Sequence, residues 1–148
     1  MASKAQVGRS SVFSIGTPGG SPTYTPVGEV KSSGITGAQW GTTDVTNYDS
    51  GVDQEFITTV RNNGSLKLDG NRVSSDAGQI MVETAFSTGA ITPFELKLPK
   101  SSGQTSAGDT FTFNALVESR DFTVGVSEVI NYSVTLKISG PVTFTAGS

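Results

Sequence analysis

The strongest constraint on the fold is the alternation of apolar and polar residues in the second half of the chain. The segments "FELKL" (94–98), "FTFNALVES" (111–119) and "INYSVTLKI" (130–138) each place an apolar side chain at every second position. Successive side chains of a β-strand point to opposite faces of a sheet, so this period gives one buried face and one polar face. The three segments therefore predict strands of an antiparallel sheet with one face on the core.

Composition supports a mainly β domain and removes several kinds of chemistry. Ser and Thr make up more than a quarter of the 148 residues, and there are 18 Gly; Thr favours strands, and Gly and Ser favour turns. A chain of this length forms one ordinary domain. It has no Cys and no His, which excludes disulfides, thiolate zinc sites and a Ser-His-Asp triad.

One helix is predicted, at about residues 75–88. Asp76 followed by Gln79 fits a capping box, and Gly89 is placed to end the helix. Met81 and Phe86 are expected to be core residues. The predicted buried stripe has helical spacing and consists of Ala77, Ile80, Met81, Thr84 and Ala85.

The first half of the chain reads less clearly. Residues 1–22 are predicted to form an N-terminal arm with at most one strand, and residues 23–37 a strand. The segment 55–70 looks like a hairpin turning at "NNG", and 139–145 like a turn followed by a last short strand. The predicted fold is mainly β: two packed antiparallel sheets, as a sandwich or part-barrel, with one flanking helix.

The stretch "TTDVTNYDSGVDQEF" (42–56) holds four carboxylates, those of Asp44, Asp49, Asp53 and Glu55. It fails as an EF-hand, since only the first and twelfth positions match that pattern. A glycosidase pair needs a sugar cleft, and the chain has a single Trp to line one. The remaining interpretation is a long connecting loop that docks on something through apolar anchors. Those anchors are Val45, Tyr48 and Val52.

Net charge and hydropathy limit the kinds of partner that the protein is expected to bind. The net charge is −3 and the pI about 4.8, which disfavours tight nucleic-acid binding. No apolar run approaches the roughly 18–20 residues of a membrane span, and the N-terminus lacks the apolar segment of a signal peptide; we expect a chain kept soluble in a cytoplasm, without a membrane anchor. The polar strand faces carry Ser, Thr and Asn more than charge. They suit a surface facing a channel or a partner, or an ordinary hydroxyl-rich exterior.

The order of three segments resembles a known family. "GEVKSSGITGAQWGTTDVTNYDSG" is a strand running into a D-x-T-N-x-D-S loop, and "NNGSLKLDGNRVSSDAGQIMVETAFSTGAITPFELKLP" leads through a helix start into a strand. "FTFNALVESRDFTVGVSEVINYSVTLKISGPVTF" is the paired-strand end. Together they resemble the major tail tube proteins of long, non-contractile-tailed, lambda-like bacteriophages. The fold of that family is shared with contractile-tail tubes and the type VI secretion tube.

The resemblance implies a structural protein of the virion tail, made in the host cytoplasm, with no enzymatic activity and no cofactor or metal. Hexameric rings would stack into a tube through which DNA passes without specific binding. Tail tip, tape measure and tail terminator proteins would be partners. Residues 1–22 would be an arm contacting the next ring, and 23–148 one domain with an inter-subunit loop at 37–54.

Within that loop, the resemblance places contacts between subunits at six residues: Asp44, Thr46, Asn47, Tyr48, Asp49 and Ser50. Candidates for side chains facing the lumen are Glu29, Glu118 and Glu128, because an acidic or neutral wall would repel phosphates. Two other hypotheses stay open at this point. One is a monomeric β-sandwich that binds a glycan or protein through residues 42–56. The other is a carboxylate-dependent hydrolase using Asp49 and Asp53.

Overall fold

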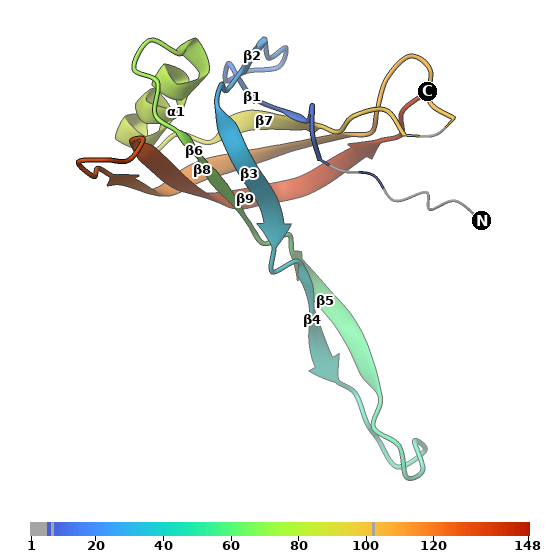
Figure 1. Ribbon diagram of the computed structural model, residues 1–148. Helices are drawn as coiled ribbons and strands as arrows, with labels where there is room; N and C mark the ends of the chain where they lie inside the picture. Colours follow the sequence, from blue (N-terminus) through green and yellow to red (C-terminus); the bar gives the residue numbers. More distant parts are fainter. Residues whose placement is uncertain (1–5, 7, 102) are drawn as a thin grey trace.

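The computed structural model describes residues 6, 8–101 and 103–148, and it is mainly β with one helix (Figure 1). A seven-stranded antiparallel sheet has the order β2-β1-β7-β8-β9-β6-β3, and β4 and β5 form a second, two-stranded sheet. This confirms the predicted fold class of two antiparallel sheets and a helix. The strands are β1 Val12–Gly16, β2 Tyr24–Pro26, β3 Val30–Thr36, β4 Gln39–Asp44, β5 Phe56–Asn62, β6 Ser65–Asn71, β7 Thr92–Lys97, β8 Thr110–Thr123 and β9 Asn131–Thr145; the helix is α1 Ala77–Thr88.

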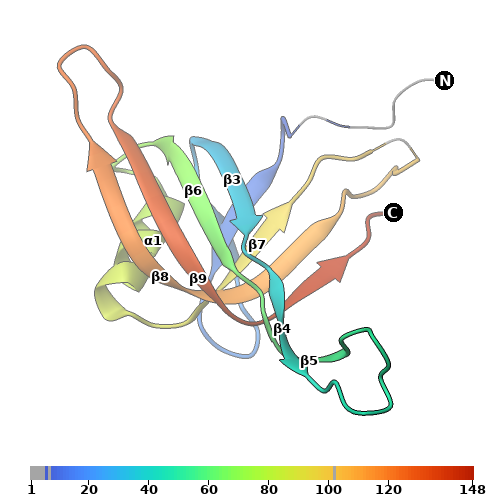
Figure 2. The ribbon, with the colours of Figure 1, turned by 90° about the horizontal axis from the view of Figure 1, so that it is seen from below.

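The core lies on one face of the large sheet, and it follows the predicted alternation. β8 and β9 are long strands that bend, so the sheet curls around its apolar face (Figures 1 and 2). Phe94, Leu66 and Leu136 are fully buried, and each such side chain contributes about 1.5–3 kcal/mol through burial. Phe94 also stacks between Phe13 and Phe113, with ring centroids 5.7 and 6.0 Å away. The layered core thus comes from one sheet folded over itself.

The predicted arm contains a strand of the core sheet. β1 lies between β2 and β7, and its residues Phe13, Ser14 and Ile15 are buried. The optional strand of the sequence prediction is therefore present. Residues 1–5 and 7 of the predicted inter-ring arm lie outside the described residues.

The predicted hairpin at 55–70 is wrong. β5 pairs with β4, whereas β6 pairs with β3 and β9. Asn63 and Gly64 therefore do not reverse the chain; they bend a long ribbon that runs out along β3–β4 and back along β5–β6. A side chain at position 64 would come within 2.0 Å of the Thr36 carbonyl oxygen, and Gly64 has a φ of +83°, so only glycine fits this bend.

The turn predicted at 139–145 is also replaced by a continuous element. β9 runs unbroken to Thr145, and its register with β8 shifts where Phe113 faces Val142 and Asn114 faces Ser139. Gly140, with a φ of +86°, and Pro141 are the extra residues of this bulge. Gly and Pro mark turns in a sequence, but they also mark bulges in strands.

The helix begins and ends where the sequence predicts. Asp76 accepts a hydrogen bond from the Gln79 N–H at 3.0 Å, and Gly89 ends the helix in the left-handed conformation. Met81 and Phe86 pack against the core while staying partly exposed. The predicted stripe is shifted, because Ala77, Ile80 and Thr84 are exposed; the buried positions are Gly78, Gln79, Val82 and Ala85.

Gln79 explains the shift of the buried helix face. Its amide donates to the carbonyls of Gly28 and Asn71 at 3.1 and 2.9 Å. Its side-chain oxygen accepts from Val73 N at 2.9 Å and from Arg72 Nη1 at 3.3 Å. The side chain therefore fastens α1 to the loop before β3 and to the end of β6. A buried polar residue of this kind is invisible to a search for apolar periodicity.

Candidate assembly surfaces

The face of the sheet opposite the core is polar across four neighbouring strands. Figure 2 shows β8, β9, β6 and β3 side by side. Their register places hydroxyl, amide and charged side chains next to one another on this outer face. Its charges are of both signs and include Lys67, Lys137, Asp69 and Asp121. Its other members are Ser32, Gly34, Thr36, Ser65, Asn71, Leu116, Thr123, Asn131, Ser133 and Thr135.

Two borders of this polar face have no strand partner in the chain. β3 pairs only with β6, so its other edge is bare. β7 pairs with β8 only over Thr110–Ala115, so the rest of β8, residues 116–123, has β9 on one side alone. Exposed strand edges carry unpaired N–H and C=O groups and readily pair with another chain. Both edges belong to the part of the sheet that β8, β9, β6 and β3 form.

The β4–β5 hairpin projects away from the body (Figure 1). Its two strands pack substantially only on each other, and every residue of β5 is exposed. Apolar side chains are exposed on it, with Val60 83% accessible and Trp40 49%. An isolated two-stranded hairpin is marginally stable in water, so its apolar residues need a partner. The region predicted as a loop at 37–54 thus begins with a strand.

The tip of the hairpin, residues 45–55, is ordered by its own side chains. Asp44 accepts from the Thr46 N–H at 2.8 Å, and Asn47 Oδ1 accepts from the Asp49 N–H at 2.9 Å. Ser50 Oγ accepts from the Asn47 N–H and donates to the Glu55 carboxylate. Side-chain and backbone hydrogen bonds from Thr46 also hold the pKa of Asp44 below its ordinary value.

This geometry divides the predicted contact residues into two roles. The side chains of Asp44, Thr46, Asn47 and Ser50 bond within the tip, whereas Tyr48 and Asp49 point out of this network. Tyr48 is 107% accessible, and Val52 is 101% accessible. The structure brings all six residues together, and their contacts with another subunit stay a prediction. The sequence did not signal that four of them shape the loop.

The three predicted lumen carboxylates do not form one cluster. Glu29 precedes β3 and accepts from Asn71 Nδ2 at 3.1 Å. Glu128 lies in the turn between β8 and β9, at the same end of the sheet, where Arg72 N donates to Ile130 O. Glu118 is exposed at a register shift within β8. Their lumen role stays a prediction.

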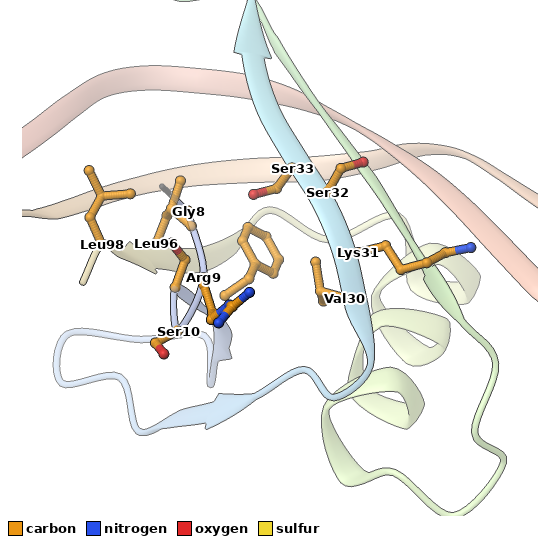
Figure 3. Close-up of a pocket in the computed structure, with 11 residues that line it drawn as sticks. Gly8, Arg9, Ser10, Val30, Lys31, Ser32, Ser33, Leu96 and Leu98 are labelled. Atoms are coloured by element: carbon orange, nitrogen blue, oxygen red, sulfur yellow. The ribbon is translucent and has the colours of Figure 1, made fainter. Parts of the chain in front are cut away.

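Two cavities lie on the body. The larger, of about 650 Å³, opens between the first half of β3 and the strands β1 and β7, and Phe13, Leu96 and Leu98 line it together with residues 8–11 and 30–33 (Figure 3). The smaller, of about 340 Å³, lies between α1 and β1 and is lined mainly by apolar groups such as Ile15, Met81 and Ala85.

Residues 6, 8–101 and 103–148 contain neither a cluster of metal ligands nor a membrane-spanning helix. No three Asp or Glu side chains there are close enough to hold a metal ion. No helix in the same part of the chain is long and apolar enough to cross a membrane. The carboxylates of the tip are therefore spread around the loop, with that of Asp44 turned back onto the Thr46 backbone.

A curved sheet with unpaired strand edges and a projecting hairpin with exposed apolar side chains fits a subunit that assembles with copies of itself. Comparison with known proteins gives the family: a profile described as phage tail tube protein matches residues 5–144. The chain belongs to the phage tail tube protein family, and it is a component of the phage tail. No curated protein matches it in sequence.

Solved structures share the fold at low sequence identity. The tail of an empty gene transfer agent particle, refined with C6 symmetry, matches with a TM-score of 0.74 and 18% identity over 96% of this chain and 100% of that one. The SPP1 tail tube matches at 0.67 and 17%, over 96% and 79%. The baseplate of the anti-feeding prophage matches at 0.70 and 12%, over 99% and 98%.

Proposed function

We propose that this subunit forms hexameric rings that stack into a hollow tail tube through which DNA passes. The observation that carries the proposal is the pair of bare edges on one layer, β3 on one side and residues 116–123 of β8 on the other. Support for six subunits comes from the C6 symmetry of the matched tail. A heterologous contact of this kind closes into a ring when its rotation divides the circle.

Ring closure pairs β3 of one copy with the bare half of β8 in the next. The four strands β8, β9, β6 and β3 then repeat around the ring as one continuous barrel. Closing a sheet removes the edges that would otherwise aggregate. The core face of each copy is already covered by β1, β7 and α1, so the polar face is the side free to line the lumen.

The polar face suits passing DNA. DNA-binding surfaces carry clustered Lys and Arg that neutralise phosphates. Here hydroxyl and amide groups dominate, and Lys67 and Lys137 share the face with Asp69 and Asp121. Such a wall gives no lasting hold on a phosphate backbone. Glu118, and Glu29 and Glu128 at one end, would add repulsion along the path.

The finer assignments follow the sequence resemblance. We infer a non-contractile, lambda-like tail, with the subunit assembling in the host cytoplasm and meeting tail tip, tape measure and terminator proteins. The matched structures include a baseplate and a tube-terminating cap of an anti-feeding prophage, which supports partners at both ends of a tube. A structural role leaves no need for an enzymatic activity or a cofactor.

Ring closure can be tested with introduced cysteines, because the chain has none. Gly34→Cys on β3 is combined in one chain with Asp121→Cys or Thr123→Cys on β8. A disulfide forms only if the two Cα atoms lie within about 7 Å. Oxidised rings should give a ladder of cross-linked species that ends at the hexamer. Electron micrographs of the same sample should show six-fold rings or tubes.

The matched control combines Gly34→Cys with Ser133→Cys, which lies in the middle of the sheet on β9. It should give no ladder, since β8 and β6 flank this strand on both sides. Single-cysteine variants should give dimers at most. A protein that stays monomeric at every concentration, with no ladder from either pair, would refute the ring and favour the alternative of a monomeric binding module using residues 42–56.

A further inference from the structure

The larger cavity has a defined chemistry. Its floor is apolar, formed by Phe13, Leu96 and Leu98, and serine hydroxyls surround its mouth. Arg9 contributes a guanidinium, which Figure 3 shows between the start of β1 and Val30 of β3. Among the described residues the ion pairs are Lys97–Glu95 and Arg120–Glu83, and Arg9 takes part in neither. Lys31 also lines the cavity, but its ammonium donates a hydrogen bond to Asn131 Oδ1. The cavity therefore offers an apolar pocket beside the Arg9 guanidinium, which forms no ion pair among the described residues.

The hairpin tip offers the complementary groups. Tyr48 and Val52 are fully exposed apolar side chains. Asp49 follows Tyr48 directly, and no hydrogen bond within the tip occupies its carboxylate, since only its N–H bonds to Asn47. The tip is already fixed by its own network, so little conformational entropy is lost on binding. An aromatic ring next to a free carboxylate is thus presented on a rigid support.

Building on the proposed tube, we propose that the hairpin tip of one subunit docks in the β1–β3–β7 cavity of a subunit in the next ring. The Tyr48 side chain packs on the apolar floor of the cavity, and the Asp49 carboxylate pairs with the Arg9 guanidinium. A carboxylate–guanidinium pair is a charge-assisted hydrogen bond with a fixed geometry. The smaller cavity is mainly apolar and its lining residues include no cation, so it does not match an acidic tip.

The positions of the two surfaces fit stacking. The cavity lies along residues 30–33, the first half of β3, and the hairpin leaves the body after the last residue of β3, Thr36. Donor and acceptor are therefore at opposite ends of one strand. A head-to-tail contact between them does not close on itself, and it adds ring after ring along an axis. Ring closure uses backbone groups at the edge of β3, whereas docking uses side chains that line the cavity, so the two contacts can be separated by mutation.

Charge reversal tests the docking. Asp49→Arg and Arg9→Glu should each leave rings and the cysteine ladder intact but reduce stacked tubes at least about tenfold, a loss of about 1.4 kcal/mol. Contacts repeated around one ring act together, which amplifies a small loss in each. Combining Asp49→Arg with Arg9→Glu in one chain should restore tubes. Glu128→Arg, a charge reversal outside the tip, should leave stacking unchanged. Arg9→Lys, which keeps the charge but loses the forked donor geometry of the guanidinium, should reduce stacking less than Arg9→Glu.

Mixing the two single variants gives a sharper result. The unchanged tip of the Arg9→Glu ring fits the unchanged cavity of the Asp49→Arg ring, and the introduced arginine faces the introduced glutamate at the other interface. Alternating rings of the mixture should therefore stack into tubes, which neither variant should form alone. Normal stacking by Arg9→Glu, or no recovery in the combined variant, would overturn the docking while the tube proposal stands. Absence of rings from the unmodified protein would instead refute the tube and the docking together.

Discussion

The body of the subunit and its β4–β5 hairpin both contain strands with apolar side chains, but these side chains are buried in the body and exposed in the hairpin. In the body, alternating residues such as Leu66 and Leu136 are fully buried within the chain. In the hairpin, Phe56 and Val60 of β5 are also apolar, yet both are exposed. Apolar alternation predicts that a strand face will be covered, but it does not say by which molecule. The difference separates residues that stabilise the fold from those left for assembly.

The variant with the largest expected effect on stability removes an aromatic side chain from the core. Phe94→Ala deletes the central member of the Phe13–Phe94–Phe113 stack and should lower the free energy of unfolding by about 3–5 kcal/mol. The matched hairpin variant Val60→Ala should change it by less than about 0.5 kcal/mol. Chemical denaturation followed by far-UV circular dichroism measures both. Equal losses would show that the hairpin is part of the cooperative body.

A smaller loss is expected where the helix is fastened. Gln79→Ala removes the side-chain partner of the part-buried backbone groups of Gly28, Asn71 and Val73, at a cost of about 3 kcal/mol. Ile80→Ala, at the next position and exposed, should be nearly neutral. Thermal unfolding of both variants checks this. A neutral Gln79→Ala would mean that apolar contacts alone hold α1 in place.

Ionisation of Tyr132 should change the free energy of unfolding only at alkaline pH. Burial raises its pKa to about 12, with smaller effects from Asp76 and Arg72. A raised pKa favours the neutral phenol in the folded state, so its contribution is complete below pH 10 and is lost as pH rises through about 12. The hydroxyl has no protein partner, so Tyr132→Phe should match the parent at neutral pH within about 1 kcal/mol. Denaturation curves between pH 8 and pH 12 should then diverge, with the variant keeping more stability.

The smallest energetic difference concerns the hairpin itself. Trp40 is the single Trp of the chain and lies on β4. Because β4 and β5 pack mainly on each other, Trp40 fluorescence of isolated subunits should change at lower denaturant than the circular dichroism of the body. Assembly should shift its emission to the blue as the hairpin is covered. Coincident transitions in isolated subunits would contradict the separation.

Much of the body could be predicted from sequence because its patterns are local. The alternation at 111–118 and 130–138 and the caps Asp76 and Gly89 each act through neighbouring residues. Pairing between distant strands is not local, so β5 looked like the partner of β6. The contact residues of the tip were found together, but their internal hydrogen bonds depend on the folded loop. Arg9 could not be identified from the sequence, because its proposed role depends on its position beside a cavity that exists only in the folded chain.

The bend at Gly64 has a geometric consequence. This residue and Gly37, with φ values of +83° and +80°, set the direction in which the ribbon leaves the sheet. If that projection joins successive rings, these two backbone conformations help to fix the pitch of the whole fibre. The rise from one ring to the next along the tail would then depend on residue 64 having no Cβ atom.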